Sequence, residues 1–355
     1  MSEGVSGGGR PIDDAGEGLC LLTGATGFIG GRLARRLAGS GHAVRALVRT
    51  GSNTTALEQL DVELVIGDLT DTQSLARATT GARHVFHCGA LVSDWATKAE
   101  IIATNVQGTR NLLEAAAAAS VERFVHFSST DVYGHPHGEA IEESQVASGF
   151  SNWYAQTKLD AEAEVRRVEA AHGLDTVILR PATVYGPGSV DVVGEIARAI
   201  RAHNMLLIDH GRVVAGLCYV ENLIDAALLA CHHEAARGLA FNVSDGIDVT
   251  WRAFTDGLAA GLGAPPVRWS LPYRPASAMA FLLEHGYRLL RRSTGLRTAP
   301  LLSRQAVQVL GRNQDFSNRR ARDLLGWTPR VDYPTGLQAT LAWLRSEPQR
   351  APARS

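Results

Sequence analysis

The stretch Thr23-Gly-Ala-Thr-Gly-Phe-Ile-Gly30 follows a short apolar run at residues 18–23 and leads into residues 28–38, where apolar side chains recur at helical spacing. A short apolar run bounded by turn residues is typical of a buried parallel strand, and the periodic segment is typical of a helix. A glycine-rich turn between such a strand and helix can hold a dinucleotide pyrophosphate at the helix N-terminus. We therefore predict a dinucleotide site here, with an ordinary turn of an αβ unit as the alternative.

Each glycine of this turn has an expected structural role. Gly24 would allow the tight turn, Gly27 the close approach of the backbone to a phosphate, and Gly30 the close packing of helix on strand. The spacing is G-x-x-G-x-x-G rather than the commoner G-x-G-x-x-G, so the prediction of a dinucleotide site depends on the strand before the turn and the helix after it. The predicted cofactor contacts of the turn are Gly24, Thr26, Gly27, Phe28, Ile29 and Gly30.

The next predicted strand, residues 42–48, ends at Arg49. Dinucleotide folds that bind NAD normally carry an acidic residue at this point, where it binds the ribose hydroxyls. A guanidinium pairs instead with the 2′-phosphate of NADP, which a carboxylate would repel. Arg49 therefore favours NADP(H), with NAD(H) still possible if Arg49 only faces water.

A pair of residues further along the chain is suited to proton transfer. Tyr154 and Lys158 stand four apart, so they share one face of a helix. Free tyrosine titrates near about 10, and a nearby ammonium is expected to lower that value. With the glycine turn, the pair predicts hydride transfer to or from an alcohol or ketone oxygen. The alternative is an amphipathic surface helix in which the spacing arises by chance.

The motifs together resemble the extended short-chain dehydrogenases/reductases of the NAD-dependent epimerase/dehydratase superfamily. The resemblance runs from about Leu19 to about Leu344 and is strongest to the 3β-hydroxysteroid dehydrogenase and dihydroflavonol reductase branch. Any one matching stretch is weak, but their order and spacing together are specific. Besides the glycine turn and Tyr154/Lys158, the matching stretches are residues 67–70, 87–90, 104–113, 127–134, 179–188 and 315–329.

The resemblance implies roles for further residues. Ser129 is expected to polarise the substrate oxygen, Asn105 is a weaker catalytic candidate, and Lys158 should also hold the nicotinamide ribose. Ser128 and Thr130 are better interpreted as capping hydroxyls, although Thr130 is kept as a substrate candidate. The implied cofactor residues beyond the turn and Arg49 are Asp68, Leu69, Cys88, Gly89, Ala90, Tyr154, Lys158, Pro181 and Thr183. The implied substrate residues are Thr130, His135 and Tyr185.

The fold class predicted is α/β, with a Rossmann-type doubly wound parallel sheet and a smaller C-terminal substrate-binding lobe. Strand and helix signals alternate through residues 18–185, and residues 213–245 are expected to return the chain to the main sheet. Residues 186–212 and 246–346 are assigned to the substrate-binding lobe. Residues 1–17 are predicted to be a disordered tail, and residues 347–355 a second tail.

Composition excludes several classes of protein. The 355 residues are 45% hydrophobic and 20% charged with a net charge of −1, which gives no basic excess for nucleic acid. The four cysteines are widely spaced and no Cys/His ligand spacing occurs, so we predict free thiols, a cytoplasmic location and no metal site. The groups His135/His137 and His232/His233/Glu234 could be imagined as metal ligands, but they are better interpreted as loop and helix-end residues.

Two further expectations concern partners other than the small-molecule substrate. No apolar run reaches the ~18 residues that span a bilayer, so no membrane span is predicted. Residues 276–292 form a basic amphipathic segment, interpreted as a helix over the substrate cleft, with weak peripheral membrane association left open. Helices at about 98–118 and 152–171 match those that pair across the family's dimer interface, so the resemblance implies a homodimer.

Three functions compete. The first is a ketoreductase or secondary-alcohol dehydrogenase acting on a bulky, largely apolar substrate. The second is a nucleotide-sugar epimerase or dehydratase, which usually carries an arginine where this chain has Ala215, although Arg212 is near. Dehydratases also often follow the catalytic threonine with an acid pair, of which only Asp131 is present here. The third is a non-catalytic NADP-sensing protein, disfavoured because Ser129, Tyr154 and Lys158 are all intact.

Overall fold

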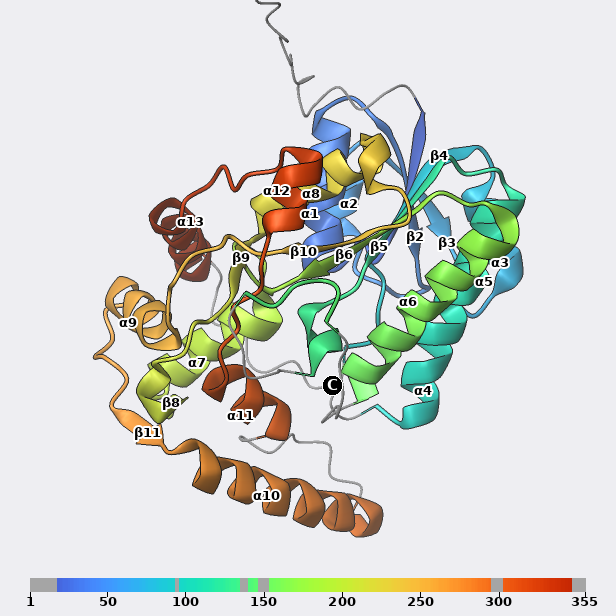
Figure 1. Ribbon diagram of the computed structural model, residues 1–355. Helices are drawn as coiled ribbons and strands as arrows, with labels where there is room; N and C mark the ends of the chain where they lie inside the picture. The colour runs from blue at the N-terminus through green and yellow to red at the C-terminus, as the bar shows by residue number, and fades with distance from the viewer. Residues whose placement is uncertain (1–17, 93–95, 135–139, 146–152, 295–302, 347–355) are drawn as a thin grey trace, which may run out of the picture.

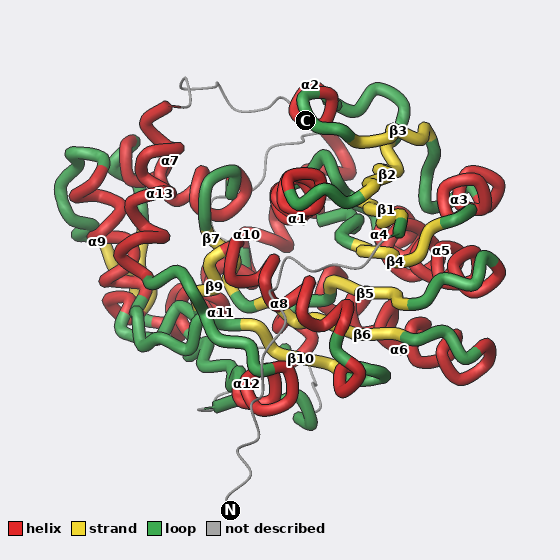
Figure 2. Tube along the Cα trace, turned by 90° about the horizontal axis from the view of Figure 1, so that it is seen from above, coloured by secondary structure: helices red, strands yellow, loops and turns green. Residues whose placement is uncertain are grey.

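A parallel sheet forms the centre of the molecule (Figures 1 and 2). The computed structural model describes residues 18–92, 96–134, 140–145, 153–294 and 303–346. Within these residues, seven strands pair in the order β10-β6-β5-β4-β1-β2-β3, and every pairing is parallel. The strands are β1 (Leu19–Thr23), β2 (Ala43–Val48), β3 (Val62–Ile66), β4 (Ala82–His87), β5 (Arg123–Phe127), β6 (Thr176–Pro181) and β10 (Ala240–Val243).

The strand order changes direction between β1 and β4. From β1 the chain builds outward to β2 and β3, then returns to the other side of β1 and builds outward through β4, β5 and β6. In open parallel sheets, ligands bind at the carboxyl ends of the strands beside such a reversal. The predicted doubly wound fold class is therefore confirmed, and the glycine turn after β1 lies beside the reversal.

Helices cover both faces of the sheet, because strands buried on both sides need two apolar layers over them. Figure 2 shows α3, α5 and α6 on one face and α1, α8 and α12 on the other. Arg36 of α1 pairs with Asp225 of α8 at 2.8 Å, which joins two helices of the second layer. The bounds are α1 (Phe28–Gly39), α2 (Thr55–Glu58), α3 (Thr72–Thr79), α5 (Gly108–Ala118), α6 (Trp153–His172), α8 (Val220–His232) and α12 (Arg319–Leu325).

The helix expected at residues 98–118 contains a wider turn. It consists of α4 (Lys98–Ile102), a π-helical turn η1 (Ala103–Gln107) and α5. Thr97 and Glu100 begin α4 with reciprocal side-chain hydrogen bonds to backbone amides, a capping box. π-turns inside helices often accompany functional sites, and this one contains the predicted site residue Asn105.

The C-terminal part of the chain builds a second apolar cluster beside the sheet (Figure 1). Its centre is aromatic: Tyr185, Trp251 and Phe254 are fully buried against one another. Two small parallel pairs, β7 with β9 and β8 with β11, lie in this part of the chain. Its elements are β7 (Thr183–Tyr185), α7 (Glu195–Arg201), β8 (Leu206–Ile208), β9 (Leu217–Tyr219), α9 (Trp251–Gly261), β11 (Trp269–Leu271), α11 (Arg304–Gly311) and α13 (Tyr333–Ser346).

The amphipathic segment predicted at 276–292 lies within one long helix, α10 (Tyr273–Thr294), at the bottom of Figure 1. Ala276 and Ala280 are buried against Ile208 and Val307, so α10 packs on the rest of the protein through its small residues. Four larger apolar side chains of α10 are exposed: Met279, Phe281, Leu282 and Leu283. Among the described residues no helix is both long enough and apolar enough to span a membrane.

Candidate active site

The turn between β1 and α1 has no room for side chains at two of its glycines. Gly24 has a φ of +70°, and a Cβ there would lie 2.7 Å from the amide nitrogen of Gly89. A Cβ on Gly30 would overlap the carbonyl oxygen of Gly24. Thr26 and Gly27, at the beginning of α1, are exposed. This geometry fits a dinucleotide, because the helix N-terminus is open to a phosphate at the carboxyl edge of the sheet.

Gly30→Ala is expected to weaken dinucleotide binding by about tenfold or more, because α1 must move away from the turn to admit one methyl group. Titration of nicotinamide fluorescence with NADPH measures the change. Gly39→Ala at the end of α1 is the matched control, since nothing lies within 4 Å of its added Cβ. Equal affinity of both variants would show that the turn does not hold the dinucleotide closely.

Polar side chains connect the strand ends next to the turn. Thr23 Oγ1 lies 2.7 Å from His87 Nδ1 and accepts a hydrogen bond from the Gly89 amide at 3.2 Å. His87 Nε2 lies 2.9 Å from Thr109 Oγ1 on α5. These bonds fix the chain that leaves β4, where the predicted cofactor residues Cys88, Gly89 and Ala90 are all partly exposed.

Arg49 is exposed directly after β2, at the carboxyl edge of the sheet. It acts on Asp68, which follows β3. Burial raises the pKa of Asp68, but the hydrogen bonds from Thr70 and then the charge of Arg49 outweigh this, so the net shift is downward. A cation and a carboxylate thus lie near each other where an adenosine ribose would be expected in this fold. Leu69, the next predicted cofactor residue, is buried.

Lys158 connects α6 to the end of β5. Its Nζ donates a hydrogen bond to the carbonyl oxygen of Phe127 at 2.7 Å and lies 5.8 Å from the centre of the Tyr154 ring. Burial lowers the pKa of Lys158 to about 8. The helix therefore brings Tyr154 and Lys158 together at the strand end that precedes Ser129.

The expected effect of Lys158 on Tyr154 is not what the structure shows. Burial and then the negative charge of Asp131 raise the pKa of Tyr154 above its usual value. The ammonium points to the Phe127 carbonyl and is itself desolvated, so it does not offset these two effects. The prediction of a lowered tyrosine pKa is therefore wrong for the protein without its ligands.

Two neighbouring serines have different surroundings. Ser129 precedes a short 3₁₀ turn, η2 (Thr130–Tyr133), and its Oγ accepts a hydrogen bond from the Asp131 amide at 3.1 Å. Accepting this bond does not use the hydroxyl proton, so Ser129 can still donate to a substrate oxygen. The Ser128 hydroxyl is buried and donates to the Glu162 carboxylate at 2.6 Å, so it has a structural role but is not the capping hydroxyl that was expected.

A buried ion pair lies behind these residues. Arg180 on β6 donates to both carboxylate oxygens of Glu162 on α6, at 2.8 and 2.6 Å. Arg180 also donates to the hydroxyl of Tyr133 at 2.8 Å, and that hydroxyl donates to Asn242 at 2.6 Å. The network thus connects α6, the Ser128 strand end, η2, β6 and β10. The sequence did not predict this network, although Glu162 follows Lys158 by four positions and so shares its helical face.

Asn105 joins the loop after β4 to α6. Its amide oxygen accepts from the Leu91 amide at 2.7 Å, and its nitrogen donates to the Leu91 carbonyl at 3.1 Å and to Thr157 at 3.2 Å. The side chain is buried. These bonds hold the loop after β4 against α6, so Asn105 has a structural role in this conformation.

Two of the predicted substrate residues, Tyr185 and Thr130, are buried. Tyr185 is fully buried because the β7–β9 pairing places it in the aromatic cluster, so the prediction of substrate contact is wrong for this conformation. Thr130 is also buried. Pro181 ends β6 and Thr183, half-buried, opens β7. His135 lies outside the described residues.

Residues 20–244 match the NAD dependent epimerase/dehydratase family. The chain belongs to this family. It is 32% identical over 321 residues to 4-hydroxy-2-methyl-3-oxo-4-farnesyl-3,4-dihydroquinoline-1-oxide ketoreductase of Stigmatella aurantiaca, with 90% of this chain and 94% of the relative covered. It is 30% identical over 336 residues to 3-beta-hydroxysteroid dehydrogenase of Mycolicibacterium neoaurum, with 90% of each covered.

A solved structure is also similar over nearly the whole chain. MoeE5 in complex with UDP-glucose and NAD superposes with a TM-score of 0.72 at 25% identity, over 93% of this chain and 99% of MoeE5. These matches confirm the predicted family, the fold class and the interpretation of the chain as a nicotinamide-dependent oxidoreductase.

Proposed function

We propose that this enzyme reduces a bulky, largely apolar ketone with NADPH, or catalyses the reverse oxidation. The observation that carries the proposal is the position of Tyr154 and Lys158 on one face of α6, fixed by the Lys158–Phe127 hydrogen bond to the strand end that precedes Ser129. The names of two relatives, a ketoreductase and a hydroxysteroid dehydrogenase, support this substrate class.

The nicotinamide, when bound, donates the hydride to the substrate carbon. In the proposed mechanism the hydroxyl of Ser129 donates a hydrogen bond to the carbonyl oxygen and polarises it. The hydroxyl of Tyr154 then delivers its proton to that oxygen. Tyr154 is protonated at neutral pH before its ligands bind, as an acid must be, but a raised pKa makes its proton harder to release. Lys158 would hold the cofactor ribose and stabilise the phenolate that proton delivery leaves.

For the cofactor, we propose a preference for NADP(H) over NAD(H). The support is Arg49, an exposed guanidinium after β2 at the place where an NAD-binding fold normally has a carboxylate. Asp68 nearby would keep Arg49 oriented toward the ribose. The proposed contacts beyond these are those of the glycine turn, the strand end at residues 88–90 and the Pro181–Thr183 stretch.

Arg49→Asp is expected to lower the ratio of kcat/KM for NADPH to that for NADH by about tenfold or more, since it replaces an ion pair with repulsion of the 2′-phosphate. Steady-state kinetics with both cofactors measures the ratio. Arg35→Asp, which makes the same charge change at an exposed position of α1, should leave the ratio unchanged. An unaltered ratio in Arg49→Asp would show that Arg49 does not contact the 2′-phosphate.

The alternative function is a nucleotide-sugar epimerase or dehydratase, as the likeness to MoeE5 allows. Ala215, where such enzymes usually carry a diphosphate-binding arginine, is fully buried, while Arg212 is exposed. A screen of NADPH oxidation with steroid ketones and 2-alkyl-3-oxo acids, set against conversion of UDP- and dTDP-sugars, separates the two functions. Turnover of sugar nucleotides alone would overturn the ketone proposal.

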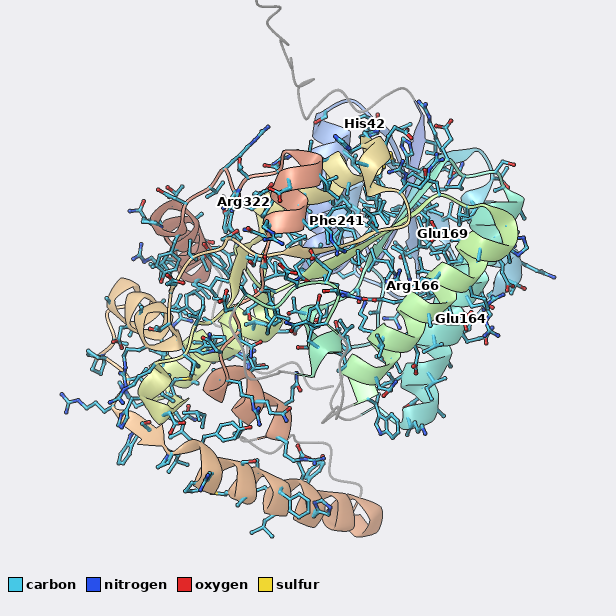
Figure 3. All side chains as sticks on the ribbon, viewed as in Figure 1. His42, Glu164, Arg166, Glu169, Phe241 and Arg322 are labelled. Carbon is cyan, nitrogen blue, oxygen red and sulfur yellow. The ribbon has the colours of Figure 1, made fainter. Side chains whose placement is uncertain are left out.

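We further propose that residues 186–212 and 246–346 form the substrate-binding lobe and that the enzyme is a cytoplasmic homodimer. The dimer would pair through α5 and α6, whose outer surface is strongly charged. Arg110 on α5 pairs with Glu164 on α6, and Figure 3 shows Glu164, Arg166 and Glu169 along that surface. The four cysteines carry no disulfide, in keeping with a reducing compartment. Light scattering at the mass of one chain, 37.9 kDa, would contradict the dimer.

A further inference from the structure

A cluster of nitrogen and sulfur ligands lies toward the amino ends of the sheet strands, away from the glycine turn at their carboxyl ends. His84 is the third residue of β4, and Cys231 and His232 are the last two residues of α8. One ligand atom of each side chain lies within 4.8 Å of those of the other two. The two imidazole rings meet edge to face, with centroids 5.0 Å apart and planes at 83°. No part of the proposed hydride chemistry uses these residues.

The register of the sheet explains why the cluster forms. Cys20 on β1 pairs with His84 on β4, which in turn pairs with Arg123 on β5. Paired residues of parallel strands point to the same face, so all three lie under the C-terminal end of α8. His84 is 5% exposed and Cys231 2% exposed, whereas His232 is exposed at the surface. The cluster is therefore preorganised on its inner side and open to water on its outer side.

Two imidazoles and one thiolate are a ligand set that Zn²⁺ prefers, with water in a fourth, tetrahedral position. Zn–N and Zn–S bonds of about 2.0–2.3 Å require ligand atoms roughly 3.3–3.8 Å apart, so the ligand atoms, now within 4.8 Å of one another, would move closer around the ion. We propose that His84, Cys231 and His232 bind one Zn²⁺ ion that joins the end of α8 to β4. The site stands independently of the proposed reductase function.

The charges around the cluster permit a cation. Arg83 and Arg123 are close, but Arg83 is paired with Glu122 at 2.7 Å and Arg123 with Asp175 at 2.9 Å. The carboxyl end of α8 carries the negative end of the helix dipole, which favours a cation.

Ion binding must remove a proton from Cys231. A free cysteine side chain is mainly a thiol at neutral pH, whereas the form that binds Zn²⁺ is the thiolate. Formation of the Zn–S bond then releases that proton to solvent, and no electron is transferred. Because the ion would lie far from the carboxyl edge of the sheet, we expect it to raise thermal stability and to leave kcat unchanged.

The test begins with full-length protein treated with a chelator and then titrated with Zn²⁺ by calorimetry, with Co²⁺ as an optical probe. We expect one ion per chain, a thiolate-to-cobalt charge-transfer band, and a higher Tm with Zn²⁺. Cys231→Ser should lose the band. His232→Ala should weaken Zn²⁺ binding by more than the roughly 10- to 100-fold typical of an outer-shell partner.

The matched control is His233→Ala, which removes the adjacent exposed histidine outside the cluster. It should bind Zn²⁺ as the unaltered protein does. Because His232 and His233 are both exposed, these two variants are expected to fold even if the buried Cys231→Ser variant does not. Equal Zn²⁺ affinity of His232→Ala and His233→Ala, or no stoichiometric binding to the unaltered protein, would overturn the proposal.

Discussion

Replacing Tyr154 with Phe should lower kcat by about 10²- to 10⁴-fold while NADPH binding changes little. The substitution removes one hydroxyl, the proposed source of the proton that the substrate oxygen receives, and general acid catalysis is worth about this much. The ring itself remains packed on α6, and Lys158 keeps its hydrogen bond to the Phe127 carbonyl. Single-turnover reduction with preformed enzyme–NADPH complex separates the chemical step from binding.

A Tyr→Phe change elsewhere controls for the loss of a hydroxyl. Tyr273 at the beginning of α10 lies in the proposed lobe, but its hydroxyl accepts a hydrogen bond from Arg312 at 2.8 Å and has no part in the proposed proton transfer, so Tyr273→Phe should keep kcat near that of the unaltered enzyme. Full activity in Tyr154→Phe would remove Tyr154 from the mechanism. Loss of NADPH binding in the same variant would instead indicate a mainly structural role.

Replacing Arg180 with Met should lower the free energy of unfolding by about 3–5 kcal/mol, the usual cost of leaving a buried charge without its partner. Glu162, 2% exposed, would keep the Ser128 hydroxyl as a hydrogen-bond donor at 2.6 Å and the half-exposed Arg166 at the longer distance of 3.9 Å. Urea denaturation followed by circular dichroism measures the change. Because Glu162 follows Lys158 on α6, we also expect a lower kcat in Arg180→Met protein that remains folded.

An exposed ion pair provides the comparison. Arg167 pairs with Glu164 at 2.7 Å and with Glu114 at 2.9 Å, but its side chain is 44% exposed. Arg167→Met should therefore change stability far less, because water screens and replaces such pairs. The double variant Glu162→Met/Arg180→Met should recover part of the loss, since no unpaired charge remains. Equal effects of Arg180→Met and Arg167→Met would contradict the importance assigned to the buried pair.

The sequence predicted those features that depend on local pattern. The glycine turn was recognisable because strand, turn and helix are contiguous, and Tyr154 and Lys158 because four residues make one helical turn. The Glu162–Arg180 pair and the His84–Cys231–His232 cluster were not recognisable, because each joins separate elements whose contact depends on strand order and register. Tyr185 was misassigned because a motif position does not tell whether a side chain points into a core.

The pKa of Tyr154 shows a further limit of sequence reasoning. The spacing of Tyr154 and Lys158 was sufficient to place them together, but the direction of a pKa shift depends on burial and on every charge nearby. Asp131 comes from a different segment, η2, and its carboxylate acts against the ammonium. The cofactor ribose and phosphates would add further charges and hydrogen bonds when bound.

The measurement that tests the central claim most directly is titration of the purified enzyme with NADPH and NADH, followed by nicotinamide fluorescence, after analysis of any cofactor retained through purification. The proposed reductase must exchange its cofactor in each turnover, so we expect reversible binding with NADPH bound more tightly than NADH. Tightly retained NAD, with no exchange for added NADPH, would contradict this account and favour an epimerase or dehydratase.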